Sequence, residues 1–233
     1  MSTLSSFGGT DINKILSTKW MLEKNFTSSG TFTVTKTGIY LIILQGAGGS
    51  GAGYNDGATC QGGGAGGTVI KSMKLIEGDS YNITIGAGGN RSKGVGNSGG
   101  NSSFGDILIA YGGGGGGINN TVGIGGSGDG GYVIKGADGG ESNSKGESMK
   151  MALPINVYTD YIKPSIIRQG GTGNGGGGGG ASMFADGGIG DYQKSETYKK
   201  GSLGSGGGGE RSSSYYSGYG GNGICVILRG VEL

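Results

Sequence analysis

The amino-acid sequence predicts a mainly β protein whose short strands carry packed helices of polyglycine. Of the 233 residues, 63 are glycine and only 2 are proline, and charged residues make up 15%. Clusters of aliphatic and β-branched residues recur between the glycine runs, which is unusual for a disordered chain. Successive clusters pass directly into glycine runs. We therefore expect a folded protein in which the runs are ordered segments anchored by a sheet.

Residues 1–25 contain little glycine and are expected to form an N-terminal attachment segment. Asp11 suits the N-cap of a short helix with apolar residues on one face, although a partly ordered terminus fits equally well. The apolar group around the single tryptophan either enters the core as a first strand or forms a docking surface. The residues expected to make attachment or oligomer contacts are Ile12, Ile15, Leu16, Trp20, Met21 and Leu22.

Strands are expected from residue 26 onward. Phe32 and Val34 alternate with polar residues, which is the period of a half-buried strand. The run 39–44 is apolar on both faces and must lie centrally in a sheet or between two layers. A turn at 77–80 has the chemistry of a hairpin connection. The expected strands are, in order, 26–35, 39–44, 68–76, 81–85, 103–111 and 223–229.

The glycine runs suit the polyglycine II helix. This helix has three residues per turn and leaves its N–H and C=O groups to bond neighbouring chains, which only glycine lets approach closely. Runs such as Gly112–Gly117 and Gly175–Gly180 would each span roughly 19 Å in this form. Each hydrogen bond contributes only about 1 kcal/mol and ordering each residue costs about as much. A bundle of such helices is therefore expected only where strands fix its ends.

An ordered series of motifs resembles the glycine-rich domain of bacteriophage tail fibres. It begins with Phe-Thr-Ser-Ser-Gly-Thr-Phe-Thr-Val at 26–34 and Gly-Ile-Tyr-Leu-Ile-Ile-Leu-Gln-Gly-Ala-Gly-Gly at 38–49. It continues through 63–70, 83–89, 99–105 and 112–117 to a terminal strand motif at 221–228. The resemblance covers residues 25–125 and 218–230. It implies a small TNF-like, jelly-roll β-sandwich that carries packed polyglycine helices.

The resemblance also implies a domain organisation and a setting. We expect one glycine-rich domain over 26–233, with a glycine-poor insertion at about 141–168. Proteins of this kind are tail-fibre or receptor-binding components, which places the chain in a virion after synthesis in the host cytoplasm. Its partners would be other fibre or baseplate proteins and a host surface glycan or protein. Such fibres are often trimeric, but the chain has no heptads, so a single tip subunit stays open.

The sequence offers little chemistry for catalysis. It has no histidine, which removes the commonest general base and metal ligand, and two cysteines do not make a zinc set. We expect no enzyme, cofactor or metal site, and acidic residues such as Asp186 and Asp191, like the Lys199–Lys200 pair, are expected to be solvated loop charges. A net charge of +2 predicts no nucleic-acid binding, and no apolar stretch is long enough for membrane insertion. Cys60 and Cys225 are expected to be free thiols, with pairing left open.

Tyrosines provide the strongest indication of binding. They lie among serine, glycine and asparagine, a composition typical of contact surfaces, although some of them could simply cap glycine helices. Prolines at 154 and 164 would stiffen the insertion as an exposed recognition loop. The expected receptor or ligand contacts are Tyr158, Tyr161, Tyr192, Tyr198, Tyr215, Tyr216 and Tyr219.

These observations predict a non-enzymatic virion component that presents loops to the host cell surface. One alternative is a purely structural baseplate or capsid decoration protein without a host ligand. A second alternative is an ice-binding polyglycine protein, but that function requires regular repeats with a uniform small outward residue. The spacers between the glycines of this chain are irregular.

Overall fold

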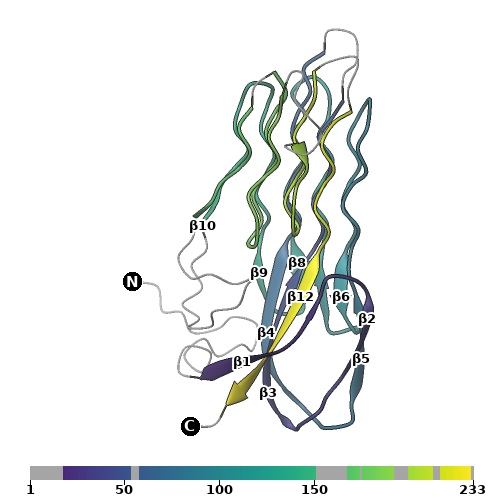
Figure 1. Ribbon diagram of the computed structural model, residues 1–233, viewed down its shortest axis with the longest axis vertical. Coiled ribbons are helices and arrows are strands. Elements are labelled where there is room, and N and C mark those ends of the chain that lie inside the picture. Colours follow the sequence, from purple (N-terminus) through teal and green to yellow (C-terminus); the bar gives the residue numbers. More distant parts are fainter. Residues whose placement is uncertain are drawn as a thin grey trace.

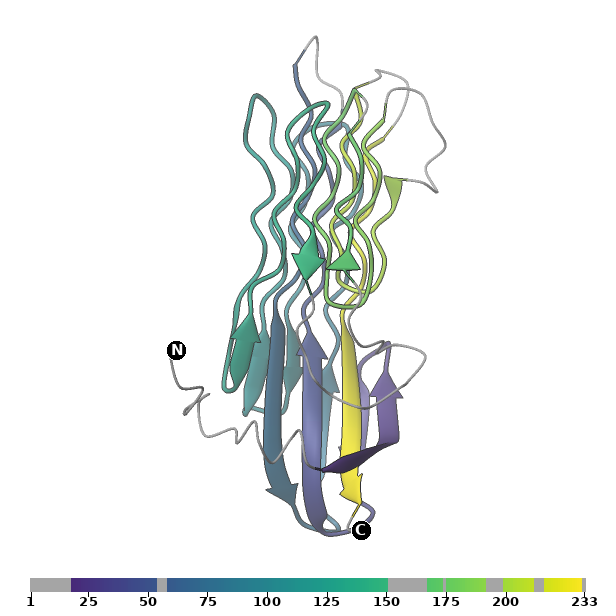
Figure 2. The same ribbon diagram turned by 90° about the vertical axis from the view of Figure 1, so that its left-hand side faces the viewer.

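The computed structural model describes residues 18–53, 58–150, 167–173, 175–191, 199–211 and 216–231. Most strands gather at one end of an elongated molecule, and wavy glycine-rich segments extend from them to the other end (Figures 1 and 2). No helix in these ranges is long and apolar enough to cross a membrane. The strands are β1 (Lys19–Phe26), β2 (Gly30–Thr33), β3 (Gly38–Gln45), β4 (Thr68–Leu75), β5 (Ser80–Thr84), β6 (Ser102–Phe104), β7 (Leu108–Ala110), β8 (Gly128–Asp129), β9 (Tyr132–Ile134), β10 (Met149–Lys150), β11 (Ile167–Arg168) and β12 (Ile224–Val231).

Two five-stranded antiparallel sheets form the framework. The first has the order β1-β12-β3-β4-β9 and the second has the order β2-β5-β6-β7-β8. The last strand of the chain therefore lies between β1 and β3, where its register pairs Val226 with Ile43. A separate pair, β10 and β11, joins the two described ends of the glycine-poor insertion. The predicted mainly β fold with a β-sandwich framework is confirmed.

Strand β3 is apolar on both faces because it separates two hydrophobic cores. Tyr40, Ile42 and Leu44 face the second sheet, whose Phe104 and other buried residues complete the core of the sandwich. The intervening Leu41 and Ile43 face the opposite side. All these β3 side chains are fully buried. The predicted central position of the 39–44 strand is therefore confirmed.

The second core covers the outer face of the first sheet. Trp20 of β1 lies in it with Met149 of β10. Segment 181–184, a bend at the base of the glycine-rich region, contributes Ala181, Met183 and Phe184. The base of the polyglycine region is thus packed against the first sheet through apolar side chains.

The glycine segments form a hydrogen-bonded bundle with a three-residue period. Residues 46–53 continue from β3, and their N–H groups donate in turn to three different neighbouring segments over distances of 2.8 to 3.1 Å. The donor–acceptor pairs are Gly46–Gly67, Gly49–Gly64 and Ala52–Gln61 with the first neighbour, Ala47–Gly100, Ser50–Asn97 and Gly53–Gly94 with the second, and Gly48–Gly221 and Gly51–Gly218 with the third. Acceptor numbers fall by three as donor numbers rise by three, so these neighbours run antiparallel. This period is that of polyglycine II.

The close approach of these segments requires glycine. A Cβ atom added to Gly178 would lie 1.6 Å from the carbonyl oxygen of Gly171, and one added to Gly62 would lie 1.9 Å from that of Gly178. Both obstacles are backbone atoms of neighbouring segments, which cannot rotate away as a side chain can. The predicted polyglycine packing is therefore present in the described residues.

Two expected strands have different bounds. The 103–111 segment is not one strand but the β6–β7 hairpin, because Gly105 adopts a positive φ of 51° and reverses the chain. The expected strand at 26–35 is divided between the end of β1 and β2. The apolar group at 20–22 was expected to form either a first strand or a docking surface. It belongs to β1, which pairs with β12, so it forms the first strand.

Candidate functional site

The end of the bundle opposite the two sheets, termed the distal end, carries the candidate site. Gly53 lies eight residues beyond Gln45, the last residue of β3, which corresponds to roughly 25 Å of polyglycine helix. Its N–H donates to the carbonyl of Gly94 (2.8 Å), so segment 90–94 reaches the same height. Asn119, Asn120 and Asn143 have positive φ angles, which asparagine tolerates better than most residues, and they allow the chain to turn back.

Two cationic and two aromatic side chains meet at the distal end. The guanidinium carbon of Arg91 lies 4.6 Å from the ring centroid of Tyr216 and 5.3 Å from that of Tyr219. The ammonium nitrogen of Lys93 lies 4.8 Å from the Tyr216 centroid. These separations are within the range of cation–π attraction. Arg91, Lys93, Tyr216 and Tyr219 are termed the cation–aromatic cluster.

Serine hydrogen bonds fix the two segments that carry this cluster. The N–H of Ser92 donates to Ser217 Oγ (2.9 Å), and the N–H of Ser217 donates to the carbonyl of Ser92 (3.1 Å). Ser92 Oγ also accepts from the N–H of Gly94 (2.9 Å). The cluster is thus held by reciprocal bonds between segments far apart in sequence. Such support reduces the ordering cost of binding a ligand.

The cluster can present positive charge together with aromatic surface. Tyr216 is 38% exposed and Lys93 is exposed, whereas Arg91 and Tyr219 are half-buried. An arginine guanidinium can bind a carboxylate or phosphate through two parallel hydrogen bonds, and a neighbouring ammonium adds charge. The arrangement therefore suits an anionic group of a larger ligand on an open surface.

The structure brings two of the seven expected contact tyrosines together. Tyr216 and Tyr219 are the pair in the cluster, and Tyr219 also contributes its carbonyl to the bundle by accepting from Gly201 (2.8 Å). Tyr158, Tyr161, Tyr192, Tyr198 and Tyr215 lie outside the described residues. Sequence reasoning missed Arg91 and Lys93. The sequence feature that could have indicated them is a pair of cationic residues in a short glycine-free turn, 91–93, between two glycine segments.

The expected attachment residues divide into buried and exposed groups. Trp20 is 7% exposed and belongs to the hydrophobic core, so it is not available for a partner. Met21 and Leu22 are 48% and 43% exposed on β1, an edge strand of the first sheet. Ile12, Ile15 and Leu16 lie outside the described residues. An exposed edge with apolar side chains can accept another chain.

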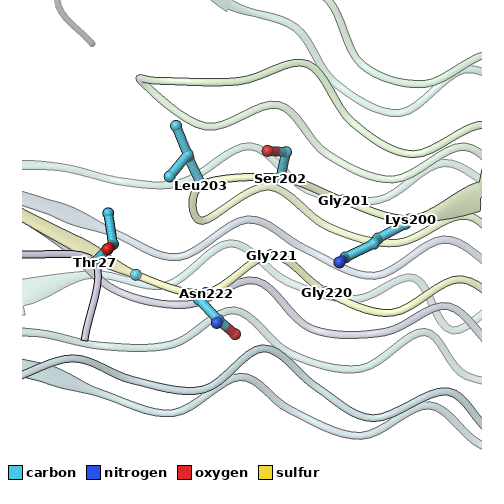
Figure 3. Close-up of a pocket in the computed structure, with 9 residues that line it drawn as sticks. Thr27, Lys200, Gly201, Ser202, Leu203, Gly220, Gly221 and Asn222 are labelled. Carbon is cyan, nitrogen blue, oxygen red and sulfur yellow. The ribbon is translucent and has the colours of Figure 1, made fainter. Parts of the chain in front are cut away.

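Two small hollows lie on the bundle. One, of about 210 Å³, is lined by Thr27, segment 200–203 and segment 220–223, with Lys200, Ser202 and Asn222 contributing polar side chains (Figure 3). The other, of about 230 Å³, lies between 135–137 and 147–149. Both are below the roughly 300–1,000 Å³ typical of small-molecule pockets.

The buried charges correct one sequence expectation. Asp186 is exposed as expected, but Asp191 is 1% exposed and Lys199 is fully buried, so neither is a solvated loop charge. Lys199 Nζ forms an ion pair with Glu210, which is also fully buried. Lys199 and Glu210 are enclosed because the glycine segments around them continue beyond these two residues. Within the described ranges, no group of three acidic or cysteine residues could hold a metal ion.

The two cysteines are free thiols, as expected, and both are buried. Cys225 lies in the core between the sheets, and burial raises the pKa of its thiol. Cys60 is in the bundle, where its Sγ donates to the carbonyl of Gly53 (2.9 Å). The two residues therefore belong to different parts of the molecule.

One family model matches the chain. Its description is a glycine-rich domain, and it matches residues 27–228. The match is continuous across the glycine-poor insertion, whereas the motifs noted in the sequence stopped near residue 125 and resumed at 218. No curated protein matches the chain.

Proposed function

This chain belongs to the glycine-rich domain family, and on that premise we propose that it is a non-enzymatic component of a bacteriophage virion. It is made in the host cytoplasm and assembled into the tail or baseplate. There it acts as a tail-fibre or receptor-binding protein whose distal end contacts the host cell surface. The proposal joins the family membership to the resemblance of the sequence motifs to tail-fibre domains.

The cation–aromatic cluster is the observation that supports this proposal best. It lies at the far end of a rigid bundle, roughly 25 Å beyond the β3 strand that anchors it. A binding surface on a rigid scaffold keeps its geometry while the turns that carry it can vary. The exposed edge strand β1 lies at the opposite end, among the sheets (Figure 1). Such a molecule is suited to being attached at one end and making contact at the other.

The ligand that the cluster fits is an anionic group of a host surface glycan. Arg91 and Lys93 supply charge, and Tyr216 supplies a partly exposed ring of the kind that stacks on sugars. A host surface protein with an acidic patch is the alternative ligand. Weakening by salt is expected in both cases because the charges are at the surface.

Binding of the fluorescently labelled full chain to cells of the host bacterium tests the proposal. Arg91→Ala/Lys93→Ala is expected to raise the apparent Kd about tenfold or more, because hydrogen bonds to charged groups contribute about 1.5–3 kcal/mol each. Tyr216→Ala should weaken binding without changing net charge. Lys36→Ala/Lys74→Ala is the matched control, since it removes two exposed lysines from the sheet end.

The outcomes separate the receptor-binding function from a purely structural one. A folded Arg91→Ala/Lys93→Ala variant that binds cells like the wild type would exclude the cluster as the contact site. If the assembled wild-type protein binds no host cells, a baseplate or decoration protein is favoured instead. Competition by purified host lipopolysaccharide but not by surface proteins would identify the glycan as the ligand.

Other virion proteins are proposed to dock on the β1 edge. Met21 and Leu22 are exposed there, and β1 is the edge strand of the first sheet among the described residues. Met21→Ser/Leu22→Ser is expected to reduce incorporation into particles while leaving cell binding by the free chain unchanged. Normal incorporation of this variant would place the attachment site elsewhere.

A further inference from the structure

The bundle encloses an acidic and a basic side chain in direct contact. The side chains of Lys199 and Glu210 are both 0% exposed, and Lys199 Nζ donates a hydrogen bond to Glu210 Oε2. Two other ion pairs, Lys135–Asp138 and Arg229–Glu23, are partly open to solvent. Among these pairs, Lys199–Glu210 is therefore the one that is removed from water.

A second buried acidic residue, Asp191, lies on a segment that neighbours Glu210. Asp191 is 1% exposed and forms a parallel β-bridge with Glu210. Its N–H donates to the carbonyl of Gly209 (3.2 Å), while the N–H of Glu210 donates to Ala52 (2.9 Å). The three residues thus lie on neighbouring segments of the bundle, held in place by backbone hydrogen bonds rather than by flexible loops.

Burial favours a reaction that removes the two charges. A buried ion pair loses the hydration of both ions, and proton transfer from ammonium to carboxylate yields an uncharged amine and acid. An uncharged, desolvated lysine amine is a nucleophile, whereas the ammonium is not. The side-chain carboxyl carbon of Glu210, Cδ, is then held next to that amine at a high effective concentration.

We propose that Lys199 and Glu210 condense to form an intramolecular amide bond inside the bundle. Lys199 Nζ attacks Glu210 Cδ, the new N–C bond forms, and one C–O bond of the carboxyl group breaks. The departing oxygen takes up protons from the nitrogen and leaves as water. Ammonium and carboxylate are thereby converted to one amide and one water, and no oxidant, cofactor or second substrate is needed.

Asp191 is assigned the proton transfer. The attacking nitrogen must lose a proton and the departing oxygen must gain one, and a carboxyl group can do both in sequence. Asp191 is the carboxyl residue that the parallel bridge places next to Glu210. Its replacement by asparagine keeps the size and removes the proton carrier.

The bond would tie together two neighbouring segments that are joined by a turn near the sheets and that also share a backbone hydrogen bond, from the N–H of Gly208 to the carbonyl of Lys199 (2.8 Å). Segments 199–203 and 205–210 are joined by that turn, where Leu203 and Gly204 have positive φ angles. Closing this loop covalently restricts the unfolded chain and so stabilises the folded one. Because Glu210 is hydrogen-bonded to Ala52, the residue before Gly53, the cross-link would lie close to the distal end. In a host-contacting protein this end would bear mechanical force.

The mass of the purified, denatured full chain tests the proposal. The wild type is expected to be lighter than its sequence mass by one water molecule. Tryptic digestion should give a branched peptide in which residues 195–200 are joined to residues 201–211, because trypsin cannot cleave after an amidated Lys199. The peptide map is essential, since succinimide formation at Asp186–Gly187 would remove one water as well.

Variants separate the cross-link from an ordinary buried ion pair. Glu210→Ala, Lys199→Arg and Asp191→Asn are each expected to have the full sequence mass, whereas the exposed neighbour variant Lys200→Arg should retain the loss of water. Glu210→Gln can condense with loss of ammonia and is expected to reach the same linked peptide. A wild-type chain with full mass and separate 195–199 and 201–211 peptides would overturn the proposal, whether or not the variants fold.

Discussion

Replacing Gly178 by alanine is expected to destabilise the bundle strongly. The added Cβ would lie 1.6 Å from the Gly171 carbonyl oxygen, whereas real Cβ contacts are essentially never below 3.0 Å. The two segments must therefore separate. Four backbone hydrogen bonds involve the peptide groups of these two glycines, namely Gly178–Ser144, Gly140–Gly178, Gly171–Gly179 and Gly146–Gly171. At about 1 kcal/mol each, their loss costs about 4 kcal/mol, a large part of a typical domain stability.

Urea unfolding followed by Trp20 fluorescence measures this effect, because Trp20 is buried in the same core as the base of the bundle. Gly209→Ala provides an intermediate case, with the nearest backbone oxygen at 2.7 Å. Gly94→Ala is the matched control, since only the Ser92 side chain lies nearby, at 3.8 Å. It should be neutral or stabilising by up to about 1 kcal/mol. Equal unfolding free energies for the three variants would refute close packing of the segments.

Three further predictions concern charge, thiols and turns. Burial raises the pKa of Glu23, but the hydrogen bonds from Arg229 and Thr35 and the charge of Arg229 together outweigh it, so the pKa is lowered. The stability that ionised Glu23 contributes is therefore present above about pH 4.5 and is lost as the pH falls below that value. Glu23→Gln should therefore flatten the acid side of the pH–stability curve, measured by urea titration. The Cys225 thiol should resist alkylation in the folded protein and react once it is unfolded, because it is fully buried and its pKa is raised; rapid native labelling would contradict its place in the core. Asn120 has a φ of 70°, so Asn120→Ala should cost about 1–2 kcal/mol while Asn120→Gly costs little, and equal melting temperatures would count against a left-handed turn residue.

The β framework could be predicted because its signals are local. The apolar run at 39–44 can only be a central strand, and the turn at 77–80 has hairpin chemistry, so β3 and the β4–β5 hairpin were found. The prediction of one strand over 103–111 is wrong. Apolar residues stand on both sides of Gly105, so the sequence pattern does not reveal that the positive φ of this glycine reverses the chain. The short strands β8 to β11 carry too few residues to produce a period.

The candidate site was only partly predictable for a different reason. Tyr216 and Tyr219 stand out by composition, but Arg91 lies far away in the sequence and meets them only through the bundle. A run of identical glycines contains no register of its own, so the strands that anchor the runs decide which segments become neighbours. The same holds for Lys199, which looks like a loop charge in the sequence and is buried by segments from elsewhere in the chain.

The three-residue period of the bundle restricts how the molecule can change in length. Residues 46, 49 and 52 all bond the same neighbouring segment, and the residues between them bond two others. Inserting one or two residues would rotate every later N–H group toward the wrong neighbour, whereas three residues would restore the pattern. Matching additions are then needed in the adjoining segments. The height of the distal end above the sheets can therefore vary only in increments of about 9 Å, one helical turn at a time.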